Sequence, residues 1–328
     1  MILPRTSDAA AKQILDSTRV FKEYARVRKE SRQLKGSLFW KKVEPYEYLA
    51  RKTQGKVTYI GQRNEETERQ FQELRHKKEQ VQHRARTLKE SVESCQRMNK
   101  AVRAGAVPPP VVDVLTQLEV VGLSEGSVVL GASALFAYAQ PAGVRVDEIS
   151  STTHGSVTEG TKHHLQVLLQ ASESTVKAAL AELRAAADIS VEITPSGGSG
   201  EQAYFLMECK FGRKRESSQC WADSSFWRAV AMKMPSALQQ ASNFEQIVIG
   251  KTGMMATMRT LDPRFFALFS HAVAQAPQSA TAQDREAAER QATLVDSLIG
   301  DHLVVSKLPE AECRRRVDDI AQRVLAKE

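Results

Sequence analysis

The sequence predicts an α+β protein, with an N-terminal long-helix hairpin that carries a small antiparallel sheet, then a mixed-sheet core, then a helical C-terminal region. Three observations support this prediction. Two stretches with helical spacing of apolar residues, 8–34 and 64–104, enclose three short β-like runs. Strand-like and helical runs then alternate as far as about residue 260. The rest of the chain has a helical pattern.

The first expected helix follows Ser7 and runs to about Leu34. A serine hydroxyl at the N-cap accepts a hydrogen bond from a free backbone N–H group, and Gly36 is expected to stop the helix. Three runs of β-branched and aromatic residues follow, with turn residues between them. These runs cover residues 37–42, 46–52 and 57–60, which predicts a small antiparallel sheet.

This small sheet combines aromatic with basic side chains. Aromatic rings can stack on nucleic-acid bases while cations hold phosphates, so the sheet is a candidate nucleic-acid surface. The commoner role of such rings is to anchor a sheet to neighbouring helices without any ligand, and both roles stay open. The candidate nucleic-acid-binding residues are Lys41, Lys42, Arg51, Lys52 and Lys56.

Residues 64–104 are expected to form one long helix. Its apolar side chains recur at spacings of three and four residues, interrupted at Lys78, as in a heptad seam. Such a seam has to pack on the first helix, on a partner subunit, or on both. A protein partner or a second copy of the chain is therefore one expected partner of this helix. Gly105 and the prolines at 108–110 then end it.

The expected domains are residues 1–107, 108–260 and 261–328. In the middle part, helices are expected over residues 111–121, 132–139, 161–170 and 173–187, and strands over residues 127–130, 143–149, 189–194, 203–211, 244–249 and 254–258. The last part is expected to contain helices over residues 263–274, 283–303 and 309–327. The rings of Phe226 and Trp227, which directly precede Arg228, could stack on a base, but packing in the core is the role expected for them.

The charge of the chain is unevenly distributed. Residues 1–107 contain 25 Lys and Arg against 13 Asp and Glu, a net charge of +12, whereas the remaining residues carry −5. A basic front part predicts a polyanionic partner, RNA or DNA. A solvated coiled-coil surface is also rich in Lys, Arg and Glu, and this alternative explains the charge equally well.

The bulk composition predicts a cytoplasmic protein with no membrane partner. The longest apolar runs are too short to cross a bilayer, and the N-terminus has no signal-peptide pattern. The four cysteines are scattered without CxxC spacing, so neither a zinc site nor a disulfide framework is indicated, and the thiols are expected to be reduced.

A strand–glycine–helix junction is expected at Gly131, Ala132 and Ser133. A glycine there lets the backbone approach a phosphate, and the N-terminus of a following helix offers free N–H groups. These three residues are therefore the candidate nucleotide-binding residues.

Several short motifs, in order along most of the chain, resemble a bacterial nucleotidyltransferase family with the polymerase-β-like fold. The motifs are Thr58–Gly61 before the long helix, Val129–Ala134 with Tyr138 and Gly143–Arg145, then Asp262–Leu268, Asp284-Arg285 and Gln291-Ala292. The resemblance implies a nucleotidyltransferase-like core, in which an Asp-x-Asp pair and a third carboxylate hold two divalent metal ions for nucleotidyl transfer.

The expected metal ligands are largely missing from this chain. His154 and Ser156 stand where the resemblance places the two aspartates, and neither carries the negative charge that Mg²⁺ prefers. Glu208 is the candidate for the third carboxylate. Asp147 and Glu148 could substitute, but adjacent residues of a strand point to opposite faces of the sheet. A lysine expected from the resemblance is also replaced, by Ser270.

The sequence therefore predicts a catalytically degenerate nucleotidyltransferase-like protein that binds nucleic acid or another macromolecule through its basic N-terminal region. Two alternatives stay open: an active nucleotidyltransferase that modifies RNA, protein or a small molecule, and a structural assembly subunit. In the active case, the candidate catalytic residues are Glu208, Asp147 and Glu148, and Mg²⁺ and an NTP are the implied cofactors. The cofactors are otherwise unknown.

Overall fold

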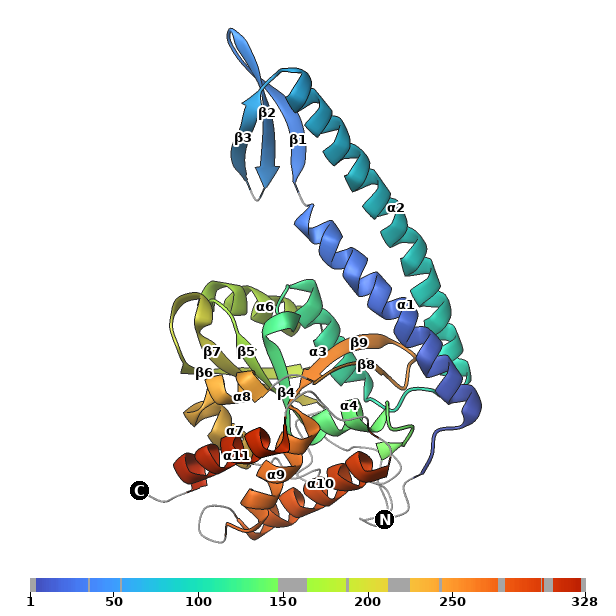
Figure 1. Cartoon of the computed structure of the whole chain (residues 1–328), viewed down its shortest axis with the longest axis vertical. Helices are drawn as coiled ribbons and strands as arrows, with labels where there is room; N and C mark the ends of the chain where they lie inside the picture. The colour runs from blue at the N-terminus through green and yellow to red at the C-terminus, as the bar shows by residue number, and fades with distance from the viewer. Residues whose placement is uncertain are drawn as a thin grey trace. The chain divides into compact units, whose positions relative to one another are not determined.

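The computed structural model describes residues 4–34, 36–53, 55–146, 164–186, 189–211, 225–241, 244–276, 281–301, 303 and 309–325. These residues form an α+β protein, as predicted (Figure 1). The chain divides into two compact units: residues 13–98 form one, and residues 1–12 with 99–328 form the other.

The unit of residues 13–98 is a helical hairpin with a small sheet, which confirms the sequence prediction for this part. Its elements are α1 (Asp8–Gln33), β1 (Ser37–Val43), β2 (Tyr46–Thr53), β3 (Lys56–Gln62) and α2 (Glu65–Ala101). The three strands are antiparallel in the order β1-β2-β3. Ion pairs join Glu23 to Arg84 and Glu30 to Lys77, so α1 and α2 run side by side.

The seam of α2 therefore packs on α1, one of the partners expected for it. The buried side chains in this stretch of the two helices include Phe21 and Val27 from α1 and Val81 from α2. Lys78, which interrupts the seam, has its own role, because its Nζ donates to the carbonyl oxygen of Gly36 at 2.7 Å. The lysine thus satisfies a backbone acceptor just beyond the end of α1.

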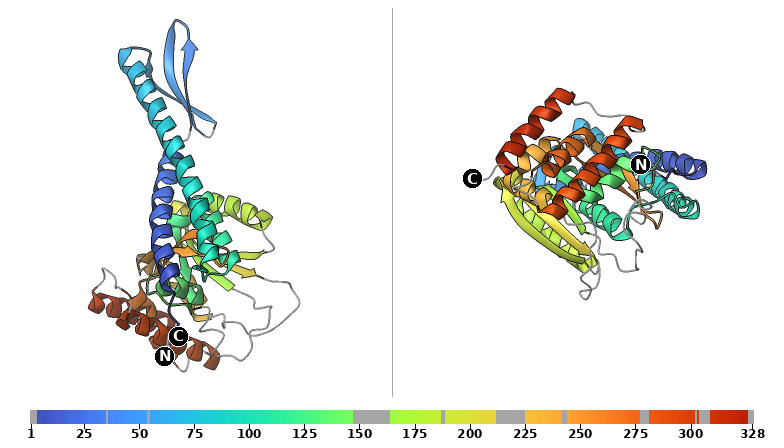
Figure 2. Two further views of the ribbon diagram at one scale, coloured as in Figure 1. Left: turned by 90° about the vertical axis from the view of Figure 1, so that its right-hand side faces the viewer. Right: turned by 90° about the horizontal axis from the view of Figure 1, so that it is seen from below.

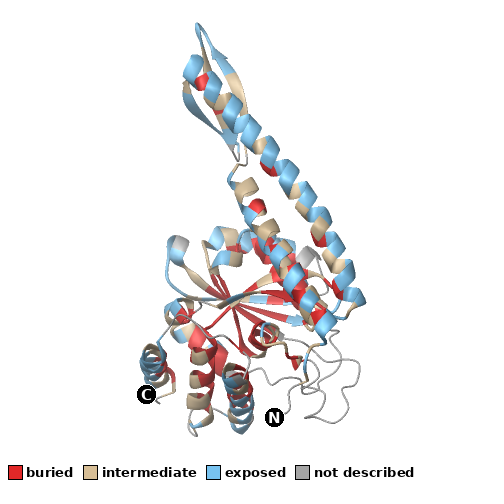
Figure 3. Ribbon diagram, turned by 45° about the vertical axis from the view of Figure 1, so that its right-hand side comes forward, coloured by how far each residue is buried: buried red, intermediate tan, exposed pale blue. Residues whose placement is uncertain are grey.

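The larger unit is built on a six-stranded sheet in the order β6-β7-β5-β4-β9-β8. Among the described strands of this sheet, β4 and β9 pair in parallel, and the other neighbours are antiparallel. The strands are β4 (Ser127–Leu130), β5 (His164–Gln170), β6 (Ile189–Gly197), β7 (Tyr204–Phe211), β8 (Phe244–Ile249) and β9 (Met255–Thr260). In Figure 3 these strands are mostly buried, whereas the small sheet of the other unit is mostly exposed or intermediate.

Helices cover both faces of the six-stranded sheet. On one face, α3 (Pro109–Val120) and α6 (Glu173–Ala186) pack against a cluster that includes Val129 and Val167. On the other face, a second cluster includes Val128, Leu130 and Leu168. Its helices are α4 (Leu135–Ala139), α7 (Ser225–Lys233), α8 (Pro235–Ala241), α9 (Pro263–Ala274), α10 (Ala282–Asp301) and α11 (Glu310–Leu325), seen together in Figure 2.

The helix expected over residues 161–170 is wrong, because His164–Gln170 is strand β5. Leu165, Val167 and Leu169 pack in one apolar cluster, and Leu168 packs in the other. A strand buried on both faces gives a nearly continuous apolar run, which periodicity alone cannot distinguish from a buried helix. This correction matters for the site, because β5 lies beside β4.

Two other elements differ in detail from the prediction. The helix after Gly131 begins as a 3₁₀ turn, η2 (Gly131–Ala134), before α4. In the strand expected over residues 143–149, Val144 makes only an isolated bridge to Arg5, and residues 147–149 lie outside the described ranges. Helices α7 and α8 were not predicted from the sequence. The remaining predicted elements agree closely with the observed ones. In the ranges that the structure describes, no helix combines the length and the apolar character that a membrane crossing needs.

Candidate functional site

The glycine turn after β4 is present as the sequence predicted. All four residues of β4 are buried, and Gly131 follows them with a φ of +67°. Residues other than glycine rarely adopt this left-handed backbone conformation, which explains why a glycine occupies this position. The chain then enters η2, in which Ser133 is buried. The junction therefore has the backbone form expected, and its role in nucleotide binding stays a prediction.

The pairing of the strands aligns a row of polar residues that starts at the end of β4 and crosses β5, β7 and β6. Leu130 pairs with Gln166 on β5, and Gln166 pairs in turn with Glu208 on β7. Glu208 also pairs with Glu192 on the edge strand β6. Residues paired in register lie on the same face of a sheet, so Gln166, Glu208 and Glu192 share the face of Leu130.

Glu208 is the central polar group of this row. Its side chain is 4% exposed, and both carboxylate oxygens are engaged. The Nε2 of Gln166 donates to its Oε1 at 3.1 Å, and the Nη1 of Arg228 donates to its Oε2 in an ion pair. Glu192 is instead largely exposed and lies 3.8 Å from the Nζ of Lys210. The buried carboxylate is thus compensated by a guanidinium and an amide from the protein itself.

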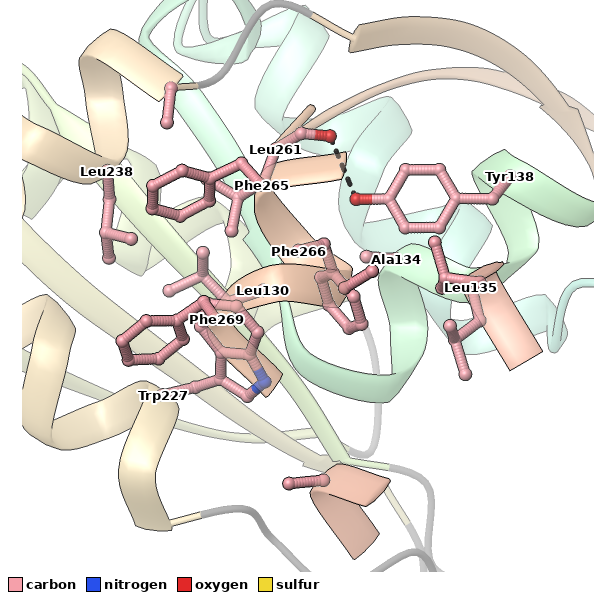
Figure 4. Packing of buried hydrophobic residues seen from close by; sticks show 14 of the residues in the cluster. Leu130, Ala134, Leu135, Tyr138, Trp227, Leu238, Leu261, Phe265, Phe266 and Phe269 are labelled. Carbon is pink, nitrogen blue, oxygen red and sulfur yellow. Dashed lines mark hydrogen bonds between the residues drawn. The ribbon is translucent and has the colours of Figure 1, made fainter. Parts of the chain in front are cut away.

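Helix α7 positions Arg228 beside the sheet, because the apolar face of this helix is buried in the core. Phe226, Trp227 and Val230 lie in the apolar cluster, while the Arg228 side chain is 47% exposed. The ring of Trp227 stacks on Phe266 with centroids 4.9 Å apart and contacts Phe269 at 5.2 Å (Figure 4). The core packing predicted for Phe226 and Trp227 is confirmed.

A second buried polar group lies where β9 leads into α9. The hydroxyl of Tyr138 donates to the carbonyl oxygen of Leu261 at 2.9 Å, and burial raises the pKa of that hydroxyl far above its ordinary value. Asp262 is fully buried, and its Oδ1 accepts the backbone N–H of Arg264 at 2.9 Å, which caps α9. These contacts fix the start of the helix, a structural role.

The described part of the site does not fit a divalent metal ion. Such an ion prefers several anionic oxygens at one place, and the row beside Gly131 brings a single buried carboxylate, already paired with a cation. A second cation beside Arg228 would meet charge repulsion. Among the described residues, no group of three or more His, Cys, Asp or Glu side chains could hold a metal ion.

Of the carboxylates and degenerate metal positions predicted for the site, the structure describes Glu208 alone. Glu208 lies on β7, two strands from β4, in the row that starts at Leu130, and its partners are Gln166 and Arg228. The other predicted site residues, Asp147, Glu148, His154 and Ser156, lie outside the described residues. Sequence reasoning missed Gln166 because β5 was assigned as a helix. It missed the role of Arg228 because no sequence spacing links α7 to β7.

The five predicted nucleic-acid-binding residues all lie on the small sheet, but not on one surface. Lys41 and Lys52 occupy register positions on the opposite face of that sheet from Lys42 and Arg51. Arg51 donates to the carbonyl oxygen of Gln33 at 2.9 Å, and Lys42 lies 3.6 Å from Glu44. Lys56, the fifth of them, begins β3 at the hairpin. The aromatic residues divide in the same way, with Trp40 packed on Phe71 of α2.

Comparison with known proteins identifies the core. A family model described as Nucleotidyltransferase matches residues 110–312, more than half of the chain. The matched segment contains the six-stranded sheet, the glycine turn and the row of Gln166 and Glu208. No curated protein and no solved structure matches the chain. On the strength of the family match, the protein belongs to the nucleotidyltransferase family.

Proposed function

We propose that this protein is a catalytically degenerate member of the nucleotidyltransferase family and that its basic N-terminal region binds nucleic acid. Nucleotidyl transfer is a phosphoryl-type displacement, in which metal ions held by carboxylates neutralise the charge that develops on the phosphate oxygens. The first half of the proposal therefore rests on whether the site offers free carboxylates near the glycine turn.

The observation that carries this half is the pairing of Glu208. Arg228 and Gln166 already donate to both oxygens of this carboxylate, in a place where its side chain is almost fully buried. A metal ion at Glu208 would have to share this carboxylate with the guanidinium of Arg228, and two cations so close together repel each other. The guanidinium supplies the positive charge that a metal ion would otherwise bring.

The position of β5 supports the same conclusion. β5 is the strand that pairs with β4 next to the glycine turn, and its residue 166 faces Glu208 across the ladder. We place the Asp-x-Asp positions of the family on this strand, at His164 and Gln166, in preference to His154 and Ser156. A glutamine there donates a hydrogen bond to Glu208, where an aspartate would repel it.

The charge of the N-terminal unit supports the second half of the proposal. Residues 13–98 contain 21 Lys and Arg against 12 Asp and Glu, a net charge of +9. The remaining residues of the chain carry 25 against 27, close to neutral. A polyanion is therefore attracted mainly to the hairpin and its small sheet, and the attraction should weaken as salt is added.

Labelled nucleotides test the catalytic half. The full-length protein is incubated with each α-labelled NTP, Mg²⁺ or Mn²⁺, and RNA, protein or small-molecule acceptors. We expect no transfer of label above a heat-denatured sample. If the wild type transfers label, the Glu208→Ala variant does not and the Glu192→Ala variant does, the proposal that the protein is catalytically degenerate is overturned. Glu192 is the matched control because it is an exposed carboxylate in the same row.

Salt-dependent binding tests the other half. The full-length protein is titrated into labelled single-stranded and duplex oligonucleotides at increasing salt, and the dissociation constant is read from fluorescence anisotropy. We expect binding at low salt. The logarithm of the association constant should fall linearly with the logarithm of the salt concentration, because each neutralised phosphate releases counterions. Absence of binding at low salt, or an affinity that does not change with salt concentration, would contradict the proposal.

A further inference from the structure

The small sheet of the N-terminal unit has two chemically different faces. One face packs on α2: Trp40 contacts Phe71 with ring centroids 5.7 Å apart, and Leu49 is fully buried. The strand register places another set of residues on the opposite face, which we call the tyrosine face. It consists of Ser37, Phe39, Lys41, Val43, Tyr46, Tyr48, Ala50, Lys52, Val57, Tyr59 and Gln62.

The rings of the tyrosine face are accessible. Tyr46 is 51% exposed and Tyr59 is 49% exposed, and the apolar side chains of Val43 and Val57 are exposed as well. Exposed aromatic and β-branched side chains grouped on one face of a sheet are unfavourable in water, and such groups commonly mark an interaction surface. In this unit they coincide with Lys41 and Lys52, which are both exposed.

The geometry around Tyr59 keeps its ring available for stacking. The Nζ of Lys41 donates to the Tyr59 hydroxyl at 2.6 Å and lies 5.2 Å from the ring centroid. These two distances together place the ammonium group at the hydroxyl end of the ring, beyond its rim. Tyr48 meets Tyr59 edge to face, with centroids 6.0 Å apart and an angle of 82°. The ring is therefore held in one orientation by two neighbours, with a cation beside it.

We propose that the tyrosine face binds a single strand of nucleic acid, with bases stacked on Tyr59 and Tyr46 and phosphates held by Lys41 and Lys52. This inference rests on the proposed nucleic-acid binding and names the form of the ligand and the residues that hold it. Base–aromatic stacking tolerates any sequence, because every base has a π face. A rigid ring with an adjacent ammonium group offers both interactions to one nucleotide.

Charge favours this occupant over a second copy of the chain. Residues 36–63, which include the small sheet, contain six Lys and Arg against two Asp and Glu. Two such sheets face to face would bring like charges together, which is unfavourable. A duplex is also a poor ligand for these rings, because its bases are stacked on one another and hidden from a flat surface.

The test uses the full-length protein and labelled oligo(dT) and oligo(U), with a duplex of equal length for comparison. Tyr59→Ala should weaken binding of both single strands by about tenfold or more, from the loss of one stacked base. Tyr59→Phe should bind nearly as the wild type does, because it keeps the ring. Lys89→Ala is the matched control for Lys41→Ala. Lys89 is an exposed lysine of α2 beside Glu93 and lies off the small sheet. We expect Lys41→Ala to weaken binding and Lys89→Ala to leave it close to that of the wild type.

The outcomes separate this inference from the proposed function. If the wild type binds single strands and both Tyr59→Ala and Tyr46→Ala bind equally well, the tyrosine face is overturned while nucleic-acid binding stands. Equal affinity for the duplex would also overturn it. If the wild type binds no nucleic acid at low salt, both proposals fail. A wild-type dimer that Tyr46→Asp dissociates in sedimentation would assign the face to a second copy and overturn the inference. Circular dichroism checks that each variant is folded.

Discussion

The guanidinium of Arg228 lies against the buried carboxylate of Glu208, and it links helix α7 to β7, the strand next to the edge of the six-stranded sheet. Glu208 is the residue that the sequence resemblance offers as the third metal-binding carboxylate, and the ion pair already engages it. The positive charge of Arg228 compensates the negative charge of the Glu208 carboxylate within the protein itself. The same ion pair holds α7 against the sheet and so contributes to the stability of the fold.

Removal of the arginine should therefore destabilise the fold. We expect Arg228→Ala to lower the free energy of unfolding by about 2–3 kcal/mol, since a buried carboxylate loses its charged partner. The exposure of Arg228 allows water to compensate in part, which keeps the loss below that of a fully buried pair. Denaturation by urea measures the change. Lys233→Ala, at the exposed end of the same helix, is the control and should change stability by less than about 0.5 kcal/mol.

A second substitution distinguishes lost charge pairing from lost packing. In the Arg228→Ala background, Glu208→Gln should restore part of the lost stability, because the amide removes the uncompensated buried charge. A double-mutant cycle in urea gives the coupling free energy between the two residues. Additive effects of the two substitutions would show that the ion pair contributes nothing measurable and would remove the basis of the catalytic argument.

The glycine turn gives a conformational prediction. Gly131 has a φ of +67°, so Gly131→Ala should cost about 1–2 kcal/mol in the free energy of unfolding. Gly300, near the end of α10, has open space where a Cβ would lie, and Gly300→Ala should stabilise the helix by about 0.5–1 kcal/mol. The opposite signs of the two effects, read from thermal or urea unfolding, check that the turn has the conformation described.

The cysteines should differ in reactivity. Burial raises the pKa of the Cys209 thiol to about 12, whereas Cys95 is only partly buried. Alkylation of the native protein near pH 8, followed by peptide mass mapping, should label Cys95 well before Cys209. The pKa of Cys209 in the folded protein lies above its ordinary value of 9.0, so the protonated thiol stabilises the fold fully below pH 9.0. The contribution is lost as the pH rises toward 12. Labelling of Cys209 at the rate of Cys95 would contradict its burial.

Much of the fold could be predicted from local sequence signals. The long helices and the small sheet follow from periodicity and turn residues, and the glycine turn follows from a buried run that ends in a small residue. The failure at His164–Gln170 has a physical cause, since a strand covered on both faces loses the alternation that identifies strands. That failure also concealed Gln166, which is recognisable only from its place in the sheet.

The candidate site was predictable only in part. Glu208 could be named because it lies in a strand late in the core, and the strand register then places it in one row with Gln166 and with Leu130, the residue before the glycine turn. Its neutralisation by Arg228 could not be foreseen, because the two residues meet through the packing of α7 on the sheet. The division of the basic residues between two faces of the small sheet likewise follows from register, which depends on the hairpin turns.

The most direct test of the central claim is a titration of the full-length protein with Mn²⁺, with free ion read by electron paramagnetic resonance. The pairing of Glu208 with Arg228 predicts that wild type, Glu208→Ala and Glu192→Ala remove the same small amount of Mn²⁺ from solution, with no site that depends on Glu208. Stoichiometric binding by the wild type that Glu208→Ala abolishes and Glu192→Ala retains would contradict this account.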